Sequence, residues 1–163
     1  MTLTRLDLLA AALLFTTLAS PAATLCKPGE RVVFACTASP KQLAVCATGD
    51  LHQPEGRLIY RFGRDAAHIE LEHGASQPPR AAGYRWAYQT WAKGETTILA
   101  FSRGEHGYTL DHSHGAFGVD GGDNFAELRV SRGEQALATI RCHEPSTVNA
   151  LYGELNKLQL PSP

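Results

Sequence analysis

The chain has 163 residues, 44% of them hydrophobic and 19% charged, and 15 Lys and Arg against 16 Asp and Glu leave a formal net charge of -1 at pH 7. This length fits one domain, and the apolar content excludes a disordered chain. The near-neutral balance, without a basic run, excludes electrostatic binding of nucleic acid, which needs a patch of Lys and Arg.

Residues 1–23 are predicted to be a signal peptide. One positive charge, Arg5, precedes the apolar run Leu8–Leu18, and the small residues of Ser20–Ala23 suit cleavage by signal peptidase after Ala22 or Ala23. The run has about 11 residues, too few to cross a bilayer core, which takes ~20. A lipoprotein site needs a small residue before its cysteine, whereas leucine precedes Cys26 here. We therefore expect a periplasmic or secreted protein without a membrane anchor, in which residues 24–163 form a single β-rich domain.

All four cysteines follow this segment, and an even number in an exported chain predicts two disulfides. Four cysteines allow three pairings, and the spacing does not select one of them. We favour the pairing in which Cys36–Cys142 joins the first and last strands while Cys26–Cys46 holds the N-terminal segment. The spacing argues against a zinc–thiolate site, because the sequence contains no C-x2–4-C pair.

Short segments of alternating polar and apolar residues recur about every ten residues, separated by Gly, Pro, Asp and Asn. Such a period of two is typical of an antiparallel β-barrel or sandwich, here of about eight to nine strands. The first two segments flank Ala38-Ser39-Pro40, which predicts a hairpin. In chain order, the predicted strands are Glu30–Thr37, Lys41–Thr48, Gly56–Gly63, His68–His73, Tyr84–Trp91, Glu95–Ser102, Gly107–Ser113, Ala126–Arg132 and Gln135–Cys142.

The C-terminal segment changes to the period of an α-helix. Its apolar residues follow the i, i+3, i+4, i+7 spacing of an amphipathic helix, and Pro145 suits the first helical turn. Pro161 ends any continuation. We predict a helix over residues 145–158 that covers a sheet face or closes one end of the fold. The apolar positions are Val148, Leu151, Tyr152, Leu155 and Leu158.

His112-x-His114 is the most suggestive chemical motif. On a strand both imidazoles point to one face, where they could share a metal ion with a third ligand from elsewhere. The candidate third ligands are His106, Asp120 and Asp123. The alternative interpretation is that the two histidines simply continue one face of their strand.

For each candidate catalytic motif in the sequence, the expected geometry argues against catalysis. Ser113 lies between the histidines, but adjacent strand residues face opposite ways, so neither histidine can activate its hydroxyl. The Gly-rich segment 120–124 lacks the residue order of an EF-hand loop and predicts a turn. Glu70 and Glu72 share one strand face, which we expect to be solvated, whereas a glycosidase needs two carboxyls across a cleft. We therefore expect no enzymatic activity and no cofactor.

The aromatic residues of the segment 84–91 divide between two faces. Tyr84, Trp86 and Tyr88 share a parity and are predicted to face the core. Trp91 has the opposite parity, which predicts a surface position where an aromatic side chain could anchor a protein contact.

Residues Trp91–Leu99 (WAKGETTIL) resemble the W-x-K-G-x-x-A-x-L stretch of periplasmic C-type lysozyme inhibitors. Members of that family have signal peptides and disulfide-tied β-barrels, so the resemblance implies an inhibitor on a barrel. The chain departs from the family, because the inhibitors' Ser/Gly-rich loop leading to a Tyr has no clear counterpart and the next cysteine is the distant Cys142. Tyr60–Gly63 (YRFG), after the cysteine hairpin, also resembles a broader set of uncharacterised exported proteobacterial proteins, which implies no activity.

Export, a small disulfide-tied β scaffold and Gly-rich loops together predict a protein-binding protein, because loops on a rigid frame commonly carry recognition. The expected partner is another exported protein, a cell-wall hydrolase or a toxin, which this inhibitor or immunity-type protein would block sterically. The alternative is an exported metal-binding domain that uses His112 and His114. The residues expected to form the binding loop and its surroundings are His112, Ser113, His114, Phe117, Asp120, Asp123 and Trp91.

Overall fold

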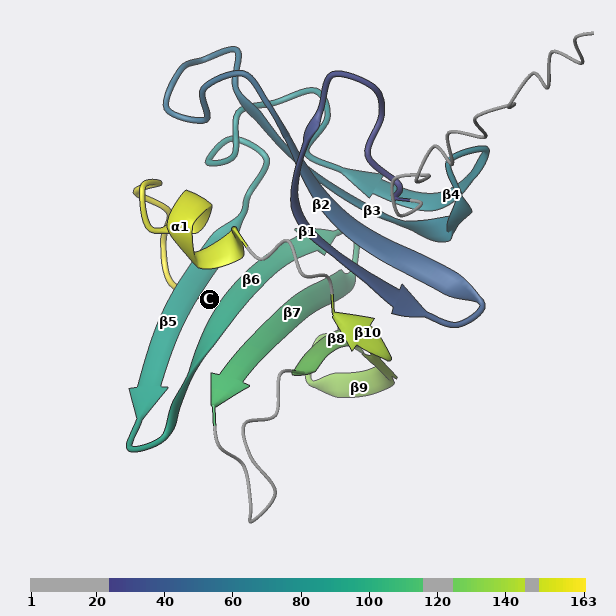
Figure 1. Cartoon of the computed structure of the whole chain (residues 1–163), viewed down its shortest axis with the longest axis vertical. Coiled ribbons are helices and arrows are strands. Elements are labelled where there is room, and N and C mark those ends of the chain that lie inside the picture. The colour runs from purple at the N-terminus through teal and green to yellow at the C-terminus, as the bar shows by residue number, and fades with distance from the viewer. Residues whose placement is uncertain (1–23, 116–124, 146–149) are drawn as a thin grey trace, which may run out of the picture.

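The computed structural model describes residues 24–115, 125–145 and 150–163, so the predicted signal peptide lies outside the described residues. Two antiparallel sheets face each other, one in the order β10-β1-β2-β3-β4 and the other in the order β5-β6-β7-β8-β9 (Figure 1). The elements are β1 (Arg31–Ala38), β2 (Lys41–Thr48), β3 (Arg57–Asp65), β4 (His68–His73), β5 (Arg85–Trp91), β6 (Gly94–Arg103), β7 (His106–Gly115), β8 (Phe125–Arg132), β9 (Gln135–Arg141), β10 (Glu144–Pro145) and α1 (Leu151–Leu155).

The fold is mainly β, as the alternating pattern predicted, and each of the nine predicted strands is confirmed to within two residues at either end. Of the two architectures left open, the described strands form the sandwich. Each sheet is open, with β10 and β4 at the edges of one and β5 and β9 at the edges of the other. The barrel implied by the resemblance to lysozyme inhibitors is therefore not the architecture of the described residues.

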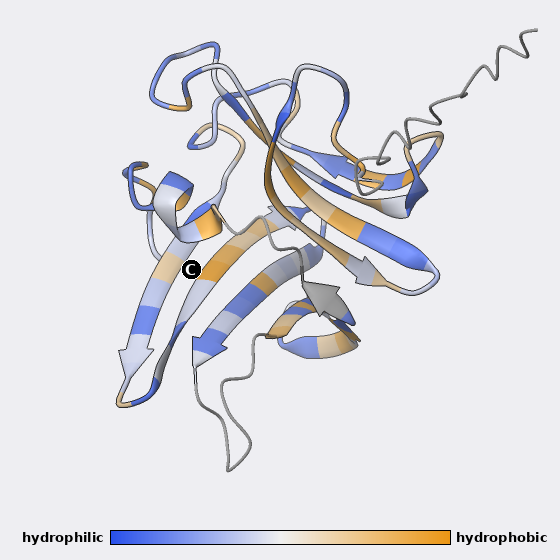
Figure 2. Cartoon of the chain, in the orientation of Figure 1, coloured by the Kyte–Doolittle hydropathy of each residue, from blue (hydrophilic) through white to orange (hydrophobic). Residues whose placement is uncertain are grey.

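The apolar faces of the two sheets meet in one core, and Figure 2 shows the apolar stretches of β2 and β6. Burying these side chains removes apolar surface from water, which is the main driving force for the two sheets to pack. The first sheet contributes Val33, Phe34, Leu43, Val45, Leu58 and Tyr60, and the second contributes Leu99, Phe101, Leu110, Ala126 and Leu128.

The predicted C-terminal helix over residues 145–158 is wrong in extent. Pro145 belongs to β10 and lies opposite Cys36 of β1, and α1 spans only Leu151–Leu155. The physical reason is a long-range contact: the Cys36–Cys142 disulfide and a hydrogen bond from the His143 N–H hold the chain against β1 before a helix can begin. The helical spacing is confirmed in part, because Leu151, Leu155 and Leu158 are all buried in the core. Val148 lies outside the described residues.

The favoured disulfide pairing is confirmed. Cys36–Cys142 links β1 of one sheet to the segment that follows β9 of the other, and Cys26–Cys46 ties the N-terminal segment to β2. Two disulfides are typical of an oxidising environment outside the cytoplasm. Within the described residues, no helix has the length and apolar character needed to cross a membrane.

A buried arginine fixes the N-terminal segment on the outer face of the first sheet. The guanidinium of Arg61 donates hydrogen bonds to Glu30, to Glu72 (2.6 Å) and to the main-chain carbonyl of Leu25 (3.2 Å). Leu25 is buried with Ala44 and Ile59 in a second, smaller apolar cluster on this face. Glu72, predicted to lie on a solvated face, is instead held by Arg61, whereas Glu70 pairs with the exposed Lys41 (2.6 Å).

Glu30 and Glu72 are expected to make the folded state sensitive to acid. Burial alone would raise the pKa of Glu30, but hydrogen bonds from Arg61 and from the Lys27 N–H outweigh burial and lower this pKa below the ordinary value of 4.5. The hydrogen bond from Arg61 is also the main cause of the lowered pKa of Glu72. Both carboxyls bind protons more weakly in the folded than in the unfolded chain. Their stabilisation is therefore complete above pH 4.5 and is lost as the pH falls further.

The check is urea unfolding of the wild type and of Glu30→Gln/Glu72→Gln between about pH 6 and pH 3. We expect the free energy of unfolding of the wild type to fall more steeply with acid than that of the double variant. Equal pH dependence in the two proteins would contradict this assignment.

Candidate functional site

The sequence-predicted site residues that the structure describes lie together at one end of the second sheet. Trp91 ends β5, Gly94 begins β6, and Gly94 lies opposite Gly115, the last residue of β7. Figure 1 shows this end of β5, β6 and β7 projecting beyond the first sheet. His112 and Ser113 are on β7 within three residues of the same end. Phe117, Asp120 and Asp123 lie outside the described residues.

His112 and Ser113 point to opposite sides of the sheet, as expected for neighbours on a strand. His112 faces the core, where its ring lies 5.1 Å from the ring of Phe34 and 4.2 Å from that of His114. Ser113 is buried on the outward side, and its hydroxyl shares a hydrogen bond of 2.7 Å with that of Thr96. This arrangement separates the serine hydroxyl from both imidazoles.

The described residues bring no third metal ligand to His112 and His114. His106 begins β7 at its far end, about 20 Å from His112 at the rise of an extended strand, and its Nε2 lies 3.4 Å from Arg132. In the described part of the chain, one group of three His, Cys, Asp or Glu ligand atoms lies within 4.8 Å, and it consists of Cys26, Glu30 and Cys46. Both cysteines of that group form a disulfide, so it is not a metal site.

A small polar cluster follows the histidines on the inward side. Glu95 lies opposite His114 in the ladder and accepts a hydrogen bond from the hydroxyl of Tyr88. This bond raises the pKa of Tyr88 to about 12, since ionising the phenol would put a second negative charge beside the carboxylate. The ring of Tyr88 also contacts Tyr152 of α1, with centroids 4.4 Å apart. Tyr84 is buried as predicted, whereas Trp86 and Tyr88 are half-buried.

The outward side of the same end carries two exposed aromatic side chains. Trp91 is 39% exposed, as its parity predicted, and Phe125 at the start of β8 is 38% exposed. Both side chains point to the outward side of the sheet. Gln89, Thr96, Ser113 and Phe125 lie opposite one another in a row across four strands, so they share this side. Trp91 is two residues from Gln89 on the same strand and therefore points the same way. We call this surface the Trp91–Phe125 face; its residues are Trp91, Gly94, Thr96, Ser113, Gly115 and Phe125.

Gly94 lets the ring of Trp91 lie directly on the sheet. A Cβ atom at Gly94 would stand 2.5 Å from the carbonyl oxygen of His114 and 2.9 Å from the indole ring, and both separations are too short for a side chain. The close approach sets the indole against the backbone of Gly94, its partner in the ladder. Among the described residues, the side chains in the strands between the two aromatic residues on this side are small, and those of Thr96 and Ser113 are buried.

Charged side chains continue the outward surface away from this face. Asp111 pairs with Arg129, and Glu127 pairs with Arg141 (3.4 Å). Burial is the main reason that the pKa of Asp111 is raised, and the charge of Glu127, which lies directly opposite, adds to the effect. Sequence reasoning missed Phe125, because the strand was predicted to begin one residue later. The parity that identified Trp91 would have identified Phe125 as well.

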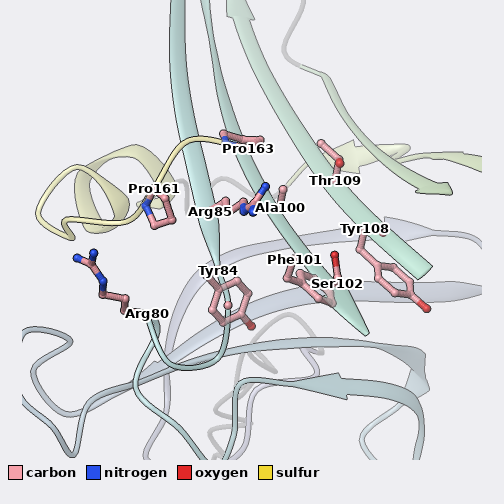
Figure 3. A pocket seen from close by; sticks show the side chains of 12 residues that line it. Arg80, Tyr84, Arg85, Ala100, Phe101, Ser102, Tyr108, Thr109, Pro161 and Pro163 are labelled. Atoms are coloured by element: carbon pink, nitrogen blue, oxygen red, sulfur yellow. The ribbon is translucent and has the colours of Figure 1, made fainter. Parts of the chain in front are cut away.

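A separate hollow of about 580 Å³ lies at the other end of the second sheet (Figure 3). The C-terminal segment forms one of its walls, since the N–H of Trp86 donates to the carbonyl of Pro161 (3.0 Å). The side chains of Arg80 and Arg85 lie beside it, together with Ser102 and Thr109. None of the sequence-predicted site residues lines this hollow.

No family model, no curated protein and no solved structure matches this chain.

Proposed function

We propose that this protein is an exported, non-enzymatic binding protein, periplasmic or secreted, that blocks another exported protein such as a cell-wall hydrolase or a toxin. The observation that carries the proposal is the Trp91–Phe125 face. Two large aromatic side chains, each more than a third exposed, lie on one side of a rigid sheet with small residues between them. Large aromatic side chains commonly supply most of the binding energy of a protein interface.

The rigidity of the face favours binding. Trp91 is held against Gly94, and the sheet beneath it is fixed by the ladder of β5 to β8. A surface that is already ordered loses little conformational freedom on association, so more of the contact energy remains as affinity. The ion pairs Asp111–Arg129 and Glu127–Arg141 would lie at the rim, where charged pairs contribute to specificity more than to affinity.

The proposed mechanism is steric. The connection between β7 and β8 starts at Gly115 and ends at Phe125, both in the Trp91–Phe125 face, so a partner whose cleft receives this connection would meet the face at its two ends. Occupation of the cleft excludes substrate without any chemistry. The described contacts support a binding role over a catalytic one, since Ser113 is bonded to Thr96 and His112 packs on Phe34 on the opposite side of the sheet.

Substitution of Trp91 is expected to weaken inhibition strongly. The assay measures release of labelled peptidoglycan by a panel of muramidases, amidases and endopeptidases in the presence of the purified mature protein. We expect at least one enzyme to be inhibited. The inhibition constant should rise about 30-fold or more in Trp91→Ala, because loss of an interface anchor costs about 2 kcal/mol.

Tyr152→Ala is the matched control, because Tyr152 is 39% exposed, like Trp91, and contacts Tyr88 on the inward side of the sheet. This variant should inhibit as the wild type does. Inhibition that survives Trp91→Ala and Phe125→Ala together would contradict the assigned face. Binding to peptidoglycan itself, with no effect on any hydrolase or toxin, would contradict the class of partner.

A further inference from the structure

Two arginines without an acidic partner line the hollow at the other end of the second sheet (Figure 3). Arg80 and Arg85 both line it, and its described lining residues include no Asp or Glu. Arg85 has no hydrogen-bond or ion-pair partner in the described part of the chain. Arg80 donates one hydrogen bond, to the carbonyl of Gln159 (3.0 Å), and keeps its other N–H donors. Positive charge with unused donors favours an anionic ligand.

The floor of this hollow is the outward side of the second sheet. Arg85 is four residues before Gln89 on β5 and therefore points to the same side. It lies opposite Ala100 of β6, which in turn lies opposite Thr109 of β7. At the usual spacing of strands, about 10 Å separates the Cα atoms of Arg85 and Thr109. The small side chain of Ala100 between them leaves room for a ligand that contacts both.

The next row of the floor carries two further hydroxyls. Gly107 lies between Ser102 of β6 and Ser131 of β8. A Cβ atom at Gly107 would stand 2.9 Å from the hydroxyl oxygen of Ser131, so a side chain here would crowd that hydroxyl. The hydroxyls of Ser102 and Ser131 form no hydrogen bond with other described residues, whereas Thr96 and Ser113 bond to each other at the far end of this side. Both serines can therefore donate to a ligand.

We infer that this hollow binds a phosphate monoester of a small organic molecule. The phosphate group would lie over Ala100, between the guanidinium of Arg85 and the hydroxyl of Thr109. Its three terminal oxygens accept more hydrogen bonds than a carboxylate does, which suits a guanidinium that acts together with several hydroxyls. The hollow of about 580 Å³ is much larger than a phosphate ion, and Pro161 and its neighbours in the C-terminal segment provide an apolar wall for the organic group.

Chemical-shift titration of the mature, ¹⁵N-labelled protein with phenyl phosphate tests the site. The amides of Gly107 and Thr109 should shift and saturate, and those of the Trp91–Phe125 face should not. In Arg85→Ala the dissociation constant should rise about tenfold or more, because a charge-assisted hydrogen bond is lost. Arg64→Ala is the matched control, since it removes an exposed arginine from the other sheet, and it should bind as the wild type does.

Inorganic phosphate and benzoate, titrated at the same ionic strength, identify the class of ligand. At about pH 7.5 a phosphate monoester is a dianion. Phenyl phosphate should bind more tightly than either of the other two, because it combines the dianion with an organic group. Inorganic phosphate that binds as tightly would overturn the monoester, and benzoate that binds as tightly would overturn the phosphate. Shifts that do not saturate, or a dissociation constant unchanged in Arg85→Ala, would overturn the site itself.

Gly107→Ala tests the floor without removing a charge. The added methyl group would crowd the Ser131 hydroxyl, so phenyl phosphate should bind several-fold more weakly. The φ of Gly107 is not positive, so the backbone accepts alanine and the variant should fold, which circular dichroism checks. Gly153→Ala in α1 is the matched control, because a Cβ atom there meets nothing within 4 Å.

Equal binding by Gly107→Ala and the wild type would contradict a phosphate on this floor. None of these outcomes bears on the hydrolase assay, because the hollow and the Trp91–Phe125 face share no residue. The two proposals therefore fail separately.

Discussion

Replacement of both Cys36 and Cys142 by alanine is expected to lower the free energy of unfolding by about 4–5 kcal/mol. The two residues are 106 apart in sequence, so their bond restricts the unfolded chain more than any short cross-link can. The bond also joins the two sheets and sets the chain against β1, where β10 forms. A domain of this size has a net stability of the same order, so the variant should be close to its unfolding threshold.

Urea unfolding at pH 7 measures this effect, and Cys26→Ala/Cys46→Ala is the matched comparison. That second bond closes only 20 residues, and its loss should cost about 3 kcal/mol. The expected order is therefore a larger loss for the long loop than for the short one. The reverse order would show that the packing of the N-terminal segment on Cys46 outweighs the effect of loop length.

Arg61→Met is expected to lower the free energy of unfolding by about 3–5 kcal/mol, because it leaves charged Glu30 without its main partner in a site where little water can reach. Arg61 is fully buried, and the Glu30 side chain beside it is almost as buried. The methionine side chain is long enough to fill much of the space of the arginine stem. The lost free energy of unfolding should therefore come mainly from the missing charge and hydrogen bonds, and less from a cavity.

Two further variants separate this effect from a general loss of packing. Arg61→Met/Glu30→Gln/Glu72→Gln should recover part of the loss, since it removes the uncompensated carboxylates as well. Arg64→Ala removes an exposed arginine of the same strand, paired with Asp65 at 3.7 Å, and should cost less than about 1 kcal/mol. A triple variant no more stable than Arg61→Met alone would contradict the role of the buried charges.

The local alternation of polar and apolar residues was sufficient to predict the strands and the exposed position of Trp91. The period of two is a local property: side chains alternate between faces on any strand, whatever it pairs with. The cysteine pairing followed from the expectation that the first and last strands lie close together, which the structure confirms. In the described residues, Trp91 and Phe125 share their face because of ladder registers that single strands do not reveal.

Features that depend on contacts between residues far apart in the sequence could not be predicted from local alternation. The helical spacing near the C-terminus is real, but pairing of Pro145 with Cys36 competes with helix formation and shortens the helix to Leu151–Leu155. Alternation sets Arg61 on the opposite face of its strand from Leu58 and Tyr60, but it cannot show that Leu25 and Glu30 fold back over that face. The same limitation concealed the environment of His112, which packs against Phe34 from the opposite sheet.

The anchoring of Leu25 and Cys26 has a consequence for the timing of maturation. The predicted cleavage site after Ala22 or Ala23 lies only two or three residues before Leu25, which is buried and whose carbonyl is bound by Arg61. A protease needs an extended, accessible stretch of backbone, and the folded domain offers none at Leu25 and Cys26, where the chain is buried, bonded to Arg61 and cross-linked. Signal peptidase is therefore expected to act on the chain as it emerges, before the Cys26–Cys46 bond closes. A precursor that folds first would remain attached to the membrane by its uncut leader.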